Sequence, residues 1–349
     1  MINNPFSLTF GREPKNLIKT NEQFDEIKEC FLRENPTTNT FLITGVRGSG
    51  KTVLLTSLQK SFDDLKDWVV VDLNPEIDML EYLASCIYEK SNAKFSFMKA
   101  EFGFSFKGVS ISISGKEPIS NVVTLLEKLL DVVKKNKKKV LICIDDVSSN
   151  ANVKTFVQQF QILLRKDYPI YLLMTGLYEN VRNLQNEKSL TFLYRAPQVR
   201  MNTLSLISIA ESFEKELGAK REEAIKMSKL TKGYAYAYQV LGYILFDAKK
   251  AKLDDDIINE FDTYLREYVY EKIYFDMPDN EKTVVTALAS SKEKKVADII
   301  NSTNINKEKM SQYRDKLIKK GVIVSTGWGK LDFALPRFNE YVLLQKEFA

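Results

Sequence analysis

Residues 45–52 read GVRGSGKT and match the pattern G-x-x-x-x-G-K-[ST] of phosphate-binding loops. The apolar stretch NTFLITG precedes the loop and the helix-like stretch KTVLLTSLQKSF continues from it, which is the strand–loop–helix context that the pattern requires. Its glycines let the backbone turn tightly, so that N–H groups can point at phosphate oxygens beside a helix N-terminus. The predicted phosphate-binding residues are Gly45, Val46, Arg47, Gly48, Ser49, Gly50, Lys51, Thr52 and Val53.

Two adjacent carboxylates, Asp145 and Asp146, end the apolar run of KKKVLICIDDVSS at residues 137–149. Burying acids at the end of a strand is costly unless a positive group meets them. The run resembles the Walker B strand of P-loop NTPases, which implies that Asp145 and Thr52 hold Mg²⁺ with Lys51 nearby. Asp146 stands where many such ATPases carry Glu, so it would orient and deprotonate the attacking water. The alternative is that Asp146 only caps the strand.

The chain has 349 residues, of which 44% are hydrophobic and 28% are charged, so we expect a soluble globular protein of two or three domains. It contains no histidine, which excludes serine–histidine and cysteine–histidine nucleophiles and His-ligated metal sites. Its three cysteines lie far apart, as suits a reducing compartment. No apolar run approaches the ~18 residues of a membrane span, and MINNPFSLTFGRE does not read as a signal peptide. We therefore expect a cytoplasmic protein without a membrane partner.

Strand-like and helix-like stretches alternate along the first 204 residues, which predicts a parallel sheet with helices on both faces. Alternating residues at 102–113 predict a β-hairpin with a turn at Lys107-Gly108. Helical patterns then follow one another at 205–217, 221–230, 234–247 and 255–274. The expected fold class is therefore α/β, with a nucleotide-binding domain at 1–204, a helical lid at 205–275 and a third domain at 276–349.

These motifs together resemble the AAA+ ATPases of the branch that groups initiator-like ATPases with STAND-type signalling ATPases, over nearly the whole chain. FGREP at 10–14 resembles the Gly-Arg box of this group, which implies that Arg12 lies near the adenine. YLLMTG resembles the sensor 1 strand, which implies that Thr175 is positioned to contact the γ-phosphate or the attacking water. The resemblance also implies ATP or ADP and Mg²⁺ as cofactors.

FLYRAPQVRMNTLSL resembles the segment after sensor 1 that carries an arginine finger in this group. Arg195, or Arg200 in its place, would then stabilise charge on the γ-phosphate of a neighbouring subunit. This role implies self-association through ATP at subunit interfaces. The alternative for Arg195 is an ordinary surface salt bridge.

LTKGYAYAYQVLGYILFD resembles the lid helix that carries sensor 2 in this group. Tyr234, Ala235 and Tyr236 stand where an arginine is expected. Either the lid senses nucleotide by packing, as STAND-type lids do, or the register of the resemblance is shifted. Because Asp146 also replaces the usual Glu, we expect slow hydrolysis.

Residues 276–349 read as three helices followed by two strands around a Gly-Trp-Gly tip, which is the order of a winged helix-turn-helix domain. Residues 291–349 hold 12 Lys/Arg and 7 Asp/Glu, whereas the rest of the chain holds 39 of each. An anionic partner is therefore plausible there. The third helix would enter the major groove of DNA and the wing would contact phosphates. The predicted DNA contacts are Lys309, Gln312, Lys316 and Lys330.

Three functions are compatible with these motifs. The first is an ATP-dependent DNA-binding switch or assembly factor. The second is a STAND-type signalling or defence ATPase whose winged helix is a protein-interaction or autoinhibitory module. The third is a small-molecule kinase, which the helical lid and the winged-helix tail disfavour.

Overall fold

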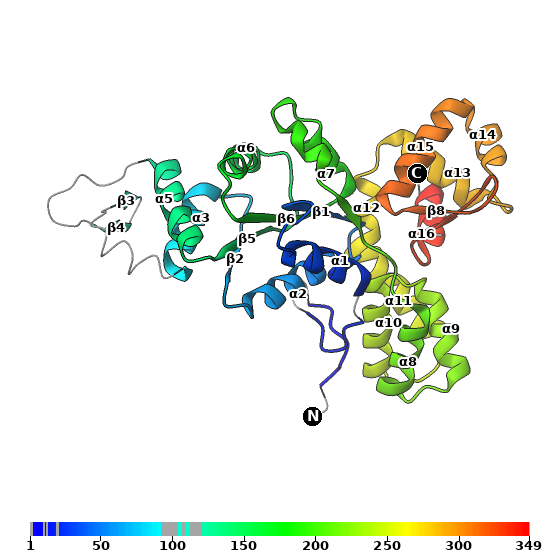
Figure 1. Ribbon diagram of the computed structural model, residues 1–349. Helices are drawn as coiled ribbons and strands as arrows, with labels where there is room; N and C mark the ends of the chain where they lie inside the picture. Colours follow the sequence, from blue (N-terminus) through cyan, green and yellow to red (C-terminus); the bar gives the residue numbers. More distant parts are fainter. Residues whose placement is uncertain are drawn as a thin grey trace. The chain divides into compact units, whose positions relative to one another are not determined.

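The computed structural model describes residues 3–9, 11, 13–18, 21–91, 104–106, 109–111 and 121–348 (Figure 1). The chain divides into two compact units. The sheet unit comprises Asn21–Thr44 and Lys51–Arg200, and the helical unit comprises Met1–Thr20, Gly45–Gly50 and Met201–Ala349. The three predicted domain ranges are a different division and stay a prediction.

A five-stranded parallel sheet forms the centre of the sheet unit, in the order β2-β5-β6-β1-β7. The predicted α/β fold with a parallel sheet is confirmed. Continuous apolar runs form these strands because both faces of the sheet are covered. The strands are β1 (Thr40–Thr44), β2 (Trp68–Leu73), β5 (Lys139–Ile144), β6 (Ile170–Gly176) and β7 (Gln198–Arg200).

Helices cover the two faces of this sheet, and alternate strand residues face opposite cores (Figure 1). Ile142 and Leu172 lie in one core with residues of α3, α5 and α6. On the other face, Phe41 and Tyr171 pack against Phe31 of α1, with ring centroids 5.4 and 4.9 Å from its ring. The helices are α1 (Asn21–Leu32), α2 (Lys51–Asp63), α3 (Met79–Lys90), α5 (Val122–Lys135), α6 (Ala151–Arg165), α7 (Tyr178–Gln185) and the 3₁₀ helix η1 (Lys188–Arg195).

The predicted hairpin is present as two short antiparallel strands, β3 (Phe104–Phe106) and β4 (Val109–Ile111). Phe104 pairs with Ile111, and Phe106 pairs with Val109. The turn at Lys107-Gly108, like the outer ends of the predicted hairpin, lies outside the described residues.

The helical unit contains a helical lid followed by a winged helix, as predicted. The lid helices are α8 (Leu206–Leu217), α9 (Arg221–Thr231), α10 (Ala235–Asp247), α11 (Asp255–Leu265), the π-helix η2 (Arg266–Tyr270) and α12 (Glu271–Phe275). The winged helix comprises α13 (Asp279–Ser290), α14 (Val296–Thr303), α15 (Lys307–Lys320), the antiparallel strands β8 (Ile323–Gly327) and β9 (Lys330–Phe333), and α16 (Phe338–Glu347). Within the described residues, no helix is long and apolar enough to cross a membrane.

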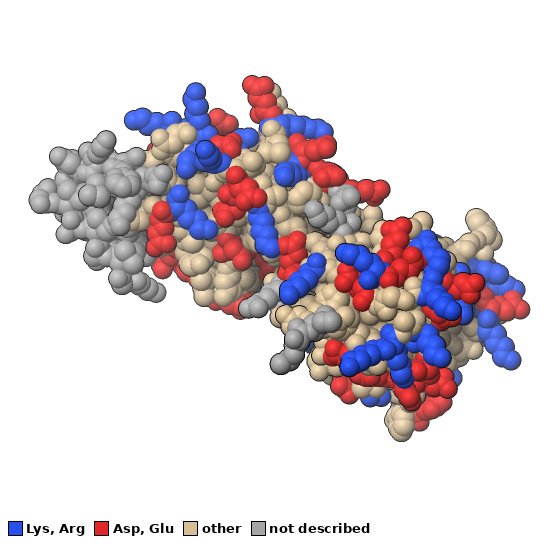
Figure 2. All heavy atoms as spheres, turned by 90° about the horizontal axis from the view of Figure 1, so that it is seen from below, with Lys and Arg blue, Asp and Glu red and all other residues tan. Residues whose placement is uncertain are grey.

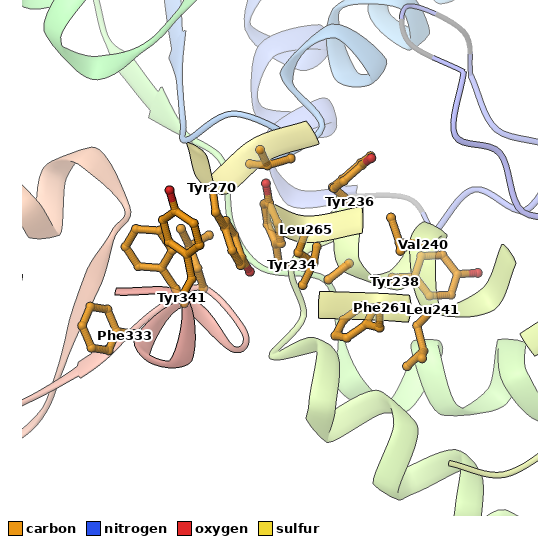
Figure 3. Close-up of a cluster of buried hydrophobic side chains, with 14 of the residues drawn as sticks. Tyr234, Tyr236, Tyr238, Val240, Leu241, Phe261, Leu265, Tyr270, Phe333 and Tyr341 are labelled. Carbon is orange, nitrogen blue, oxygen red and sulfur yellow. The ribbon is translucent and has the colours of Figure 1, made fainter. Parts of the chain in front are cut away.

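The lid and the winged helix share one hydrophobic core, part of which is drawn in Figure 3. The Tyr270 hydroxyl donates to the carbonyl oxygen of Pro336, and the Arg337 guanidinium binds both carboxylate oxygens of Asp262. Lys232 of the lid donates to the carbonyl oxygen of Phe333, at 2.8 Å. These contacts fix the winged helix to the lid, at the end of α9 and along the helix that begins with α11.

The first residues of the chain pack on the lid helices as well. Phe6 is buried, with its ring centroid 5.9 Å from that of Phe213 and 5.6 Å from that of Tyr238. The backbone N–H of Ser7 donates to Oε1 of Gln239 at 2.9 Å. The segment before the Gly-Arg box is therefore part of the lid core.

A buried carboxylate ties two helices of the winged helix together. Glu281 of α13 is 1% exposed and pairs with Lys320 and, at 2.8 Å, with Lys316, both on α15. Removing one partner of a buried ion pair leaves an uncompensated charge. Glu281→Ala is therefore expected to destabilise the winged helix by about 3 kcal/mol, measured by urea unfolding with circular dichroism.

Asp315→Ala is the matched control for this prediction. Asp315 also lies on α15 and pairs with Lys319 at 2.7 Å, but both side chains are exposed, so its removal should leave the unfolding midpoint unchanged. Hydrogen exchange of α13 and α15 assigns the transition to this domain. Equal midpoints for the two variants would show that the Glu281 pairs add no stability.

Candidate functional site

Asp145 accepts two side-chain hydrogen bonds at the carboxyl end of β5. The Thr52 hydroxyl, in the first turn of α2, donates to Oδ2 of Asp145 at 2.8 Å. The Thr175 hydroxyl, near the end of β6, donates to Oδ1 of the same carboxylate. Neighbouring parallel strands end at the same edge of the sheet, so three residues that are distant in the sequence meet there. The structure thus brings together Thr52, Asp145 and Thr175.

Asp146 is exposed and has a backbone φ of 50°. This left-handed conformation is uncommon for residues other than glycine, but Asp and Asn tolerate it. The backbone N–H of Asp146 donates to Oγ1 of Thr175 at 3.1 Å. The buried Thr175 hydroxyl therefore donates to one carboxylate and accepts from the backbone of the next residue. Its observed role is to position both aspartates.

A third carboxylate, Asp72, lies at the end of the neighbouring strand β2. Nε2 of Gln59, on α2, donates to Oδ1 of Asp72 at 2.9 Å. Burial raises the pKa of Asp72, and the charge of Asp145 raises it further, whereas the bond from Gln59 lowers it. Asp72 is not among the site residues predicted from the sequence, although WVVVDL has the same signal as LICIDD, an acid at the end of an apolar strand.

Lys51 opens α2 and is 9% exposed. An ammonium group is rarely buried to this degree without polar partners. Its neighbour Val53 lies in the same turn and is partly buried. The predicted charged residue of the loop motif is therefore held at the start of a helix in the sheet unit.

The loop Gly45–Gly50 belongs to the helical unit. Gly48 and Gly50 have φ values of 70° and 93°, so both adopt the left-handed conformation that favours glycine. The Tyr234 hydroxyl donates to the Arg47 carbonyl oxygen. The Tyr236 N–H donates to the Gly48 carbonyl oxygen at 3.1 Å. Of the remaining loop residues, Gly45 lies beside Met201 and beside Ser49 of the same loop. Val46 lies beside Gly321.

The structure places the two candidate finger residues at separate points of the sheet unit. Arg195 is exposed at the end of η1. Arg200 ends β7, and its carbonyl oxygen accepts from Nε2 of Gln23 at 3.4 Å; burial lowers the pKa of its guanidinium. Arg12 lies outside the described residues.

Of the four predicted DNA contacts, Lys309, Gln312 and Lys330 are exposed in the winged helix. Lys316 instead pairs with Glu281, a contact that the sequence pattern does not reveal. On the face drawn in Figure 2, Lys and Arg side chains are interspersed with Asp and Glu, and neither sign forms a continuous patch.

The donor set around Asp145 suits Mg²⁺. The Thr52 hydroxyl and the Asp145 carboxylate supply hard oxygen donors 2.8 Å apart. Mg²⁺ is commonly bound by one or two carboxylates together with waters and the phosphates of a substrate. The residues present therefore fit this ion.

Comparisons with known proteins extend these observations. A family model described as a domain of unknown function (DUF8462) matches residues 267–342, and a search of curated protein sequences finds no match. The chain is similar to the ORC2 protein of Aeropyrum pernix in its ADPNP–ADP complexes, with a TM-score of 0.56 and 12% identity over 98% of each chain. The ADP form of that protein gives a TM-score of 0.52 at 12% identity, over 98% of this chain and 97% of that chain.

A third similar structure is Cdc6p from Pyrobaculum aerophilum, with a TM-score of 0.49 and 14% identity over 97% of this chain and 96% of that chain. The two ORC2 comparisons extend over almost the full length of both chains. The chain therefore has the overall fold of this ORC2 protein, and its own elements form a parallel-sheet domain, a helical lid and a C-terminal winged helix.

Proposed function

We propose that this chain binds ATP with Mg²⁺, hydrolyses it slowly, and acts as an ATP-dependent DNA-binding switch or assembly factor. The observation that carries the nucleotide part is the pair of hydrogen bonds from Thr52 and Thr175 to Asp145. They join the start of the helix that follows the phosphate loop to the acidic end of β5. The ORC2 protein of similar fold was solved with ADPNP and ADP, which supports the proposal.

The proposed roles follow the predicted motif. Residues 45–53 hold the phosphates, Lys51 supplies positive charge, and Arg12 lies toward the adenine. Thr52 and Asp145 hold Mg²⁺, which when bound neutralises developing phosphate charge. Asp146 accepts the proton of the attacking water. Thr175 positions Asp146, because its hydroxyl oxygen accepts a hydrogen bond from the Asp146 backbone N–H.

Self-association is part of this proposal. Arg195 is exposed at the end of a short helix, where a guanidinium is available to a second copy of the chain. An arginine finger acting from a neighbour stabilises transition-state charge. Arg200, which ends β7 and is also exposed, is the second candidate.

The proposed DNA binding can be tested by substituting the exposed cations of the winged helix. Each phosphate contact contributes about one unit to the slope of log affinity against log salt. Lys309→Ala combined with Lys330→Ala should flatten this slope by about two and leave ATP affinity unchanged. Fluorescence anisotropy on random duplex DNA across a salt series measures both effects. Lys316 is left intact because its removal would disturb the Glu281 pair.

Lys229→Ala combined with Lys346→Ala is the charge-matched control. Both residues are exposed, on α9 and α16, and neither belongs to α15, β8 or β9, so the slope should stay within about half a unit of wild type. An equal loss of slope in both double variants would mean that DNA binding depends only on the net charge of the protein and not on the winged-helix surface.

A second function is favoured by a specific contact. A Cβ atom built on Gly321, which ends α15, would lie 3.5 Å from Cβ of Val46, and the Arg47 guanidinium lies 4.0 Å from the Asp276 carboxylate. The winged helix thus packs against the phosphate loop, as expected for an autoinhibitory module in a STAND-type signalling ATPase. Wild-type protein that binds no DNA at low salt, with ATP or with ADP, would put this function first.

A further inference from the structure

The start of α10 holds the phosphate loop by its carbonyl groups. The Tyr234 hydroxyl donates to the Arg47 carbonyl oxygen, and the Tyr236 N–H donates to the Gly48 carbonyl oxygen at 3.1 Å. Figure 3 shows the rings of Tyr234, Tyr236 and Tyr238 leaving this helix end in different directions. Both hydrogen bonds lie within the helical unit, so the lid contacts two consecutive peptide groups of the loop.

These bonds set the direction of amide groups as well as carbonyls. The peptide group is planar and trans, so its C=O and N–H point in opposite directions. Holding the Arg47 carbonyl therefore orients the Gly48 N–H away from the lid, and holding the Gly48 carbonyl orients the Ser49 N–H in the same way. Phosphate loops bind their ligand through such N–H groups. The Ser49 N–H donates to the Val46 carbonyl oxygen at 3.2 Å in this structure.

The contact is close enough to require glycine at position 48. A Cβ atom there would lie 2.4 Å from Oη of Tyr234 and 2.8 Å from Cβ of Tyr236, and Gly48 has a φ of 70°. A larger residue would have to separate the loop from the lid. Gly48 stands at a position that the motif leaves open, and it serves the lid contact as well as the tight turn.

Tyr234 is itself held in one position. The preceding residue, Gly233, has a φ of 74°, and its carbonyl oxygen accepts from the Leu204 N–H at 2.8 Å. Tyr234 is 4% exposed. Burial raises the pKa of its hydroxyl above the usual range, so the group is protonated and can donate at neutral pH.

We propose that Tyr234 is a positioning residue of the phosphate loop, whose hydroxyl holds the Arg47–Gly48 peptide in the orientation that presents the Gly48 N–H to a phosphate. The proposal rests on ATP binding at residues 45–52. It links the lid to the nucleotide through the loop, without the arginine that the resemblance leads one to expect at this place. The link acts on the loop backbone, so it serves ADP and ATP alike.

Tyr234→Phe removes only the hydroxyl and leaves the ring in the core. The Arg47 carbonyl then loses its partner, and the loop spends less time in the competent conformation. Apparent affinity falls in proportion to the competent fraction, so the dissociation constants for ADP and for ATP should both rise about 10-fold. Calorimetry measures both values.

Tyr238→Phe is the matched control. Tyr238 lies one turn further along α10, is buried, and shares a 2.6 Å hydrogen bond with Ser212 that does not involve the loop. Its variant loses a buried hydroxyl of the same helix, so a general weakening of the lid would appear in both variants. Nucleotide affinity should stay within about 2-fold of wild type for Tyr238→Phe if the effect of Tyr234 is specific.

Hydrogen exchange in the wild-type protein provides a readout that needs no variant. Nucleotide should slow exchange in residues 45–50 and in residues 233–237 together, because the two segments share the hydrogen bonds described above. Protection of 45–50 without any change at 233–237 would overturn the proposal. So would a Tyr234→Phe protein with the affinity of the Tyr238→Phe control.

The failure of this proposal can be told from the failure of ATP binding itself. If Lys51→Ala leaves affinity unchanged, nucleotide does not bind at the loop and both ideas are wrong. If Lys51→Ala abolishes binding while Tyr234→Phe has no effect, ATP binds as proposed and only the positioning role of Tyr234 is wrong.

Discussion

Lys51→Ala is expected to abolish binding of ATP and ADP. Lys51 is 9% exposed at the start of α2, and its ammonium is the charged group of the loop motif. Hydrogen bonds to charged groups contribute about 1.5–3 kcal/mol each, so losing the charge and its bonds to phosphate oxygens should weaken binding by at least roughly 100-fold. Isothermal titration calorimetry with each nucleotide measures this loss.

Lys60→Ala is the control on the same helix. Lys60 lies near the end of α2 and is exposed, so its variant should bind nucleotide like the wild type. Circular dichroism of both variants should show the same helix content. Unchanged affinity in Lys51→Ala would mean that phosphate is held elsewhere, and the proposed nucleotide function would be wrong.

Asp146→Asn should lower ATP turnover by roughly 100-fold or more, as loss of a general base commonly does. Asparagine tolerates the left-handed backbone of this position, so the N–H bond to Thr175 is expected to persist. An amide cannot accept the proton of the attacking water. ATP affinity should stay within about 3-fold of wild type, because Thr52 and Asp145 are untouched. Phosphate release under single-turnover conditions measures the chemical step.

Asp72→Asn is the control carboxylate. Asp72 ends the neighbouring strand and already accepts from Gln59, so turnover should change far less than in Asp146→Asn. A turnover number that is normal in Asp146→Asn and low in Asp72→Asn would transfer the role of base to Asp72. Normal turnover in both would leave Thr175 as the group that orients the water.

The same assay tests the arginine finger. Arg195→Ala and Asp146→Asn are each expected to be slow, but an equimolar mixture should regain part of the wild-type rate. Mixed interfaces pair an intact finger of one subunit with an intact base of the other. If mixing restores nothing and ultracentrifugation with ATP finds only monomer, Arg195 does not act on a neighbour.

The sequence by itself predicted the elements that have strong local signals. Four apolar stretches became strands β1, β2, β5 and β6 of the parallel sheet, and the helix predicted at 205–217 appears as α8 (Leu206–Leu217). The fifth strand, β7, alternates exposed and buried residues and has no such signal. Hydrophobic periodicity and helix ends are local properties, so they survive in any tertiary context. Helices α7 and α16 were not predicted. Helix α7 lies in a short polar stretch, and α16 follows the two wing strands, which are the last elements of the predicted winged-helix pattern.

The sequence also predicted the chemistry of individual site residues, but only the tertiary structure decided their partners. Thr175 was expected to feel a phosphate, yet its hydroxyl is shared between Asp145 and the backbone of Asp146. Lys316 was expected to contact DNA, yet it pairs with the buried Glu281. Each partner comes from a different helix or strand, and no local pattern records which side chains meet across a packed interface.

The lid shows the same division. A missing arginine at Tyr234-Ala235-Tyr236 was visible in the sequence as a departure from the resemblance. In the folded chain the Tyr234 hydroxyl binds the Arg47 carbonyl oxygen. This contact depends on the packing of α10 against the loop and on the backbone of Gly233. Residue types set which hydrogen bonds are possible. Their geometry is set by the long-range contacts of the folded chain, because a hydrogen bond forms only where both partners are placed within about 3 Å of each other.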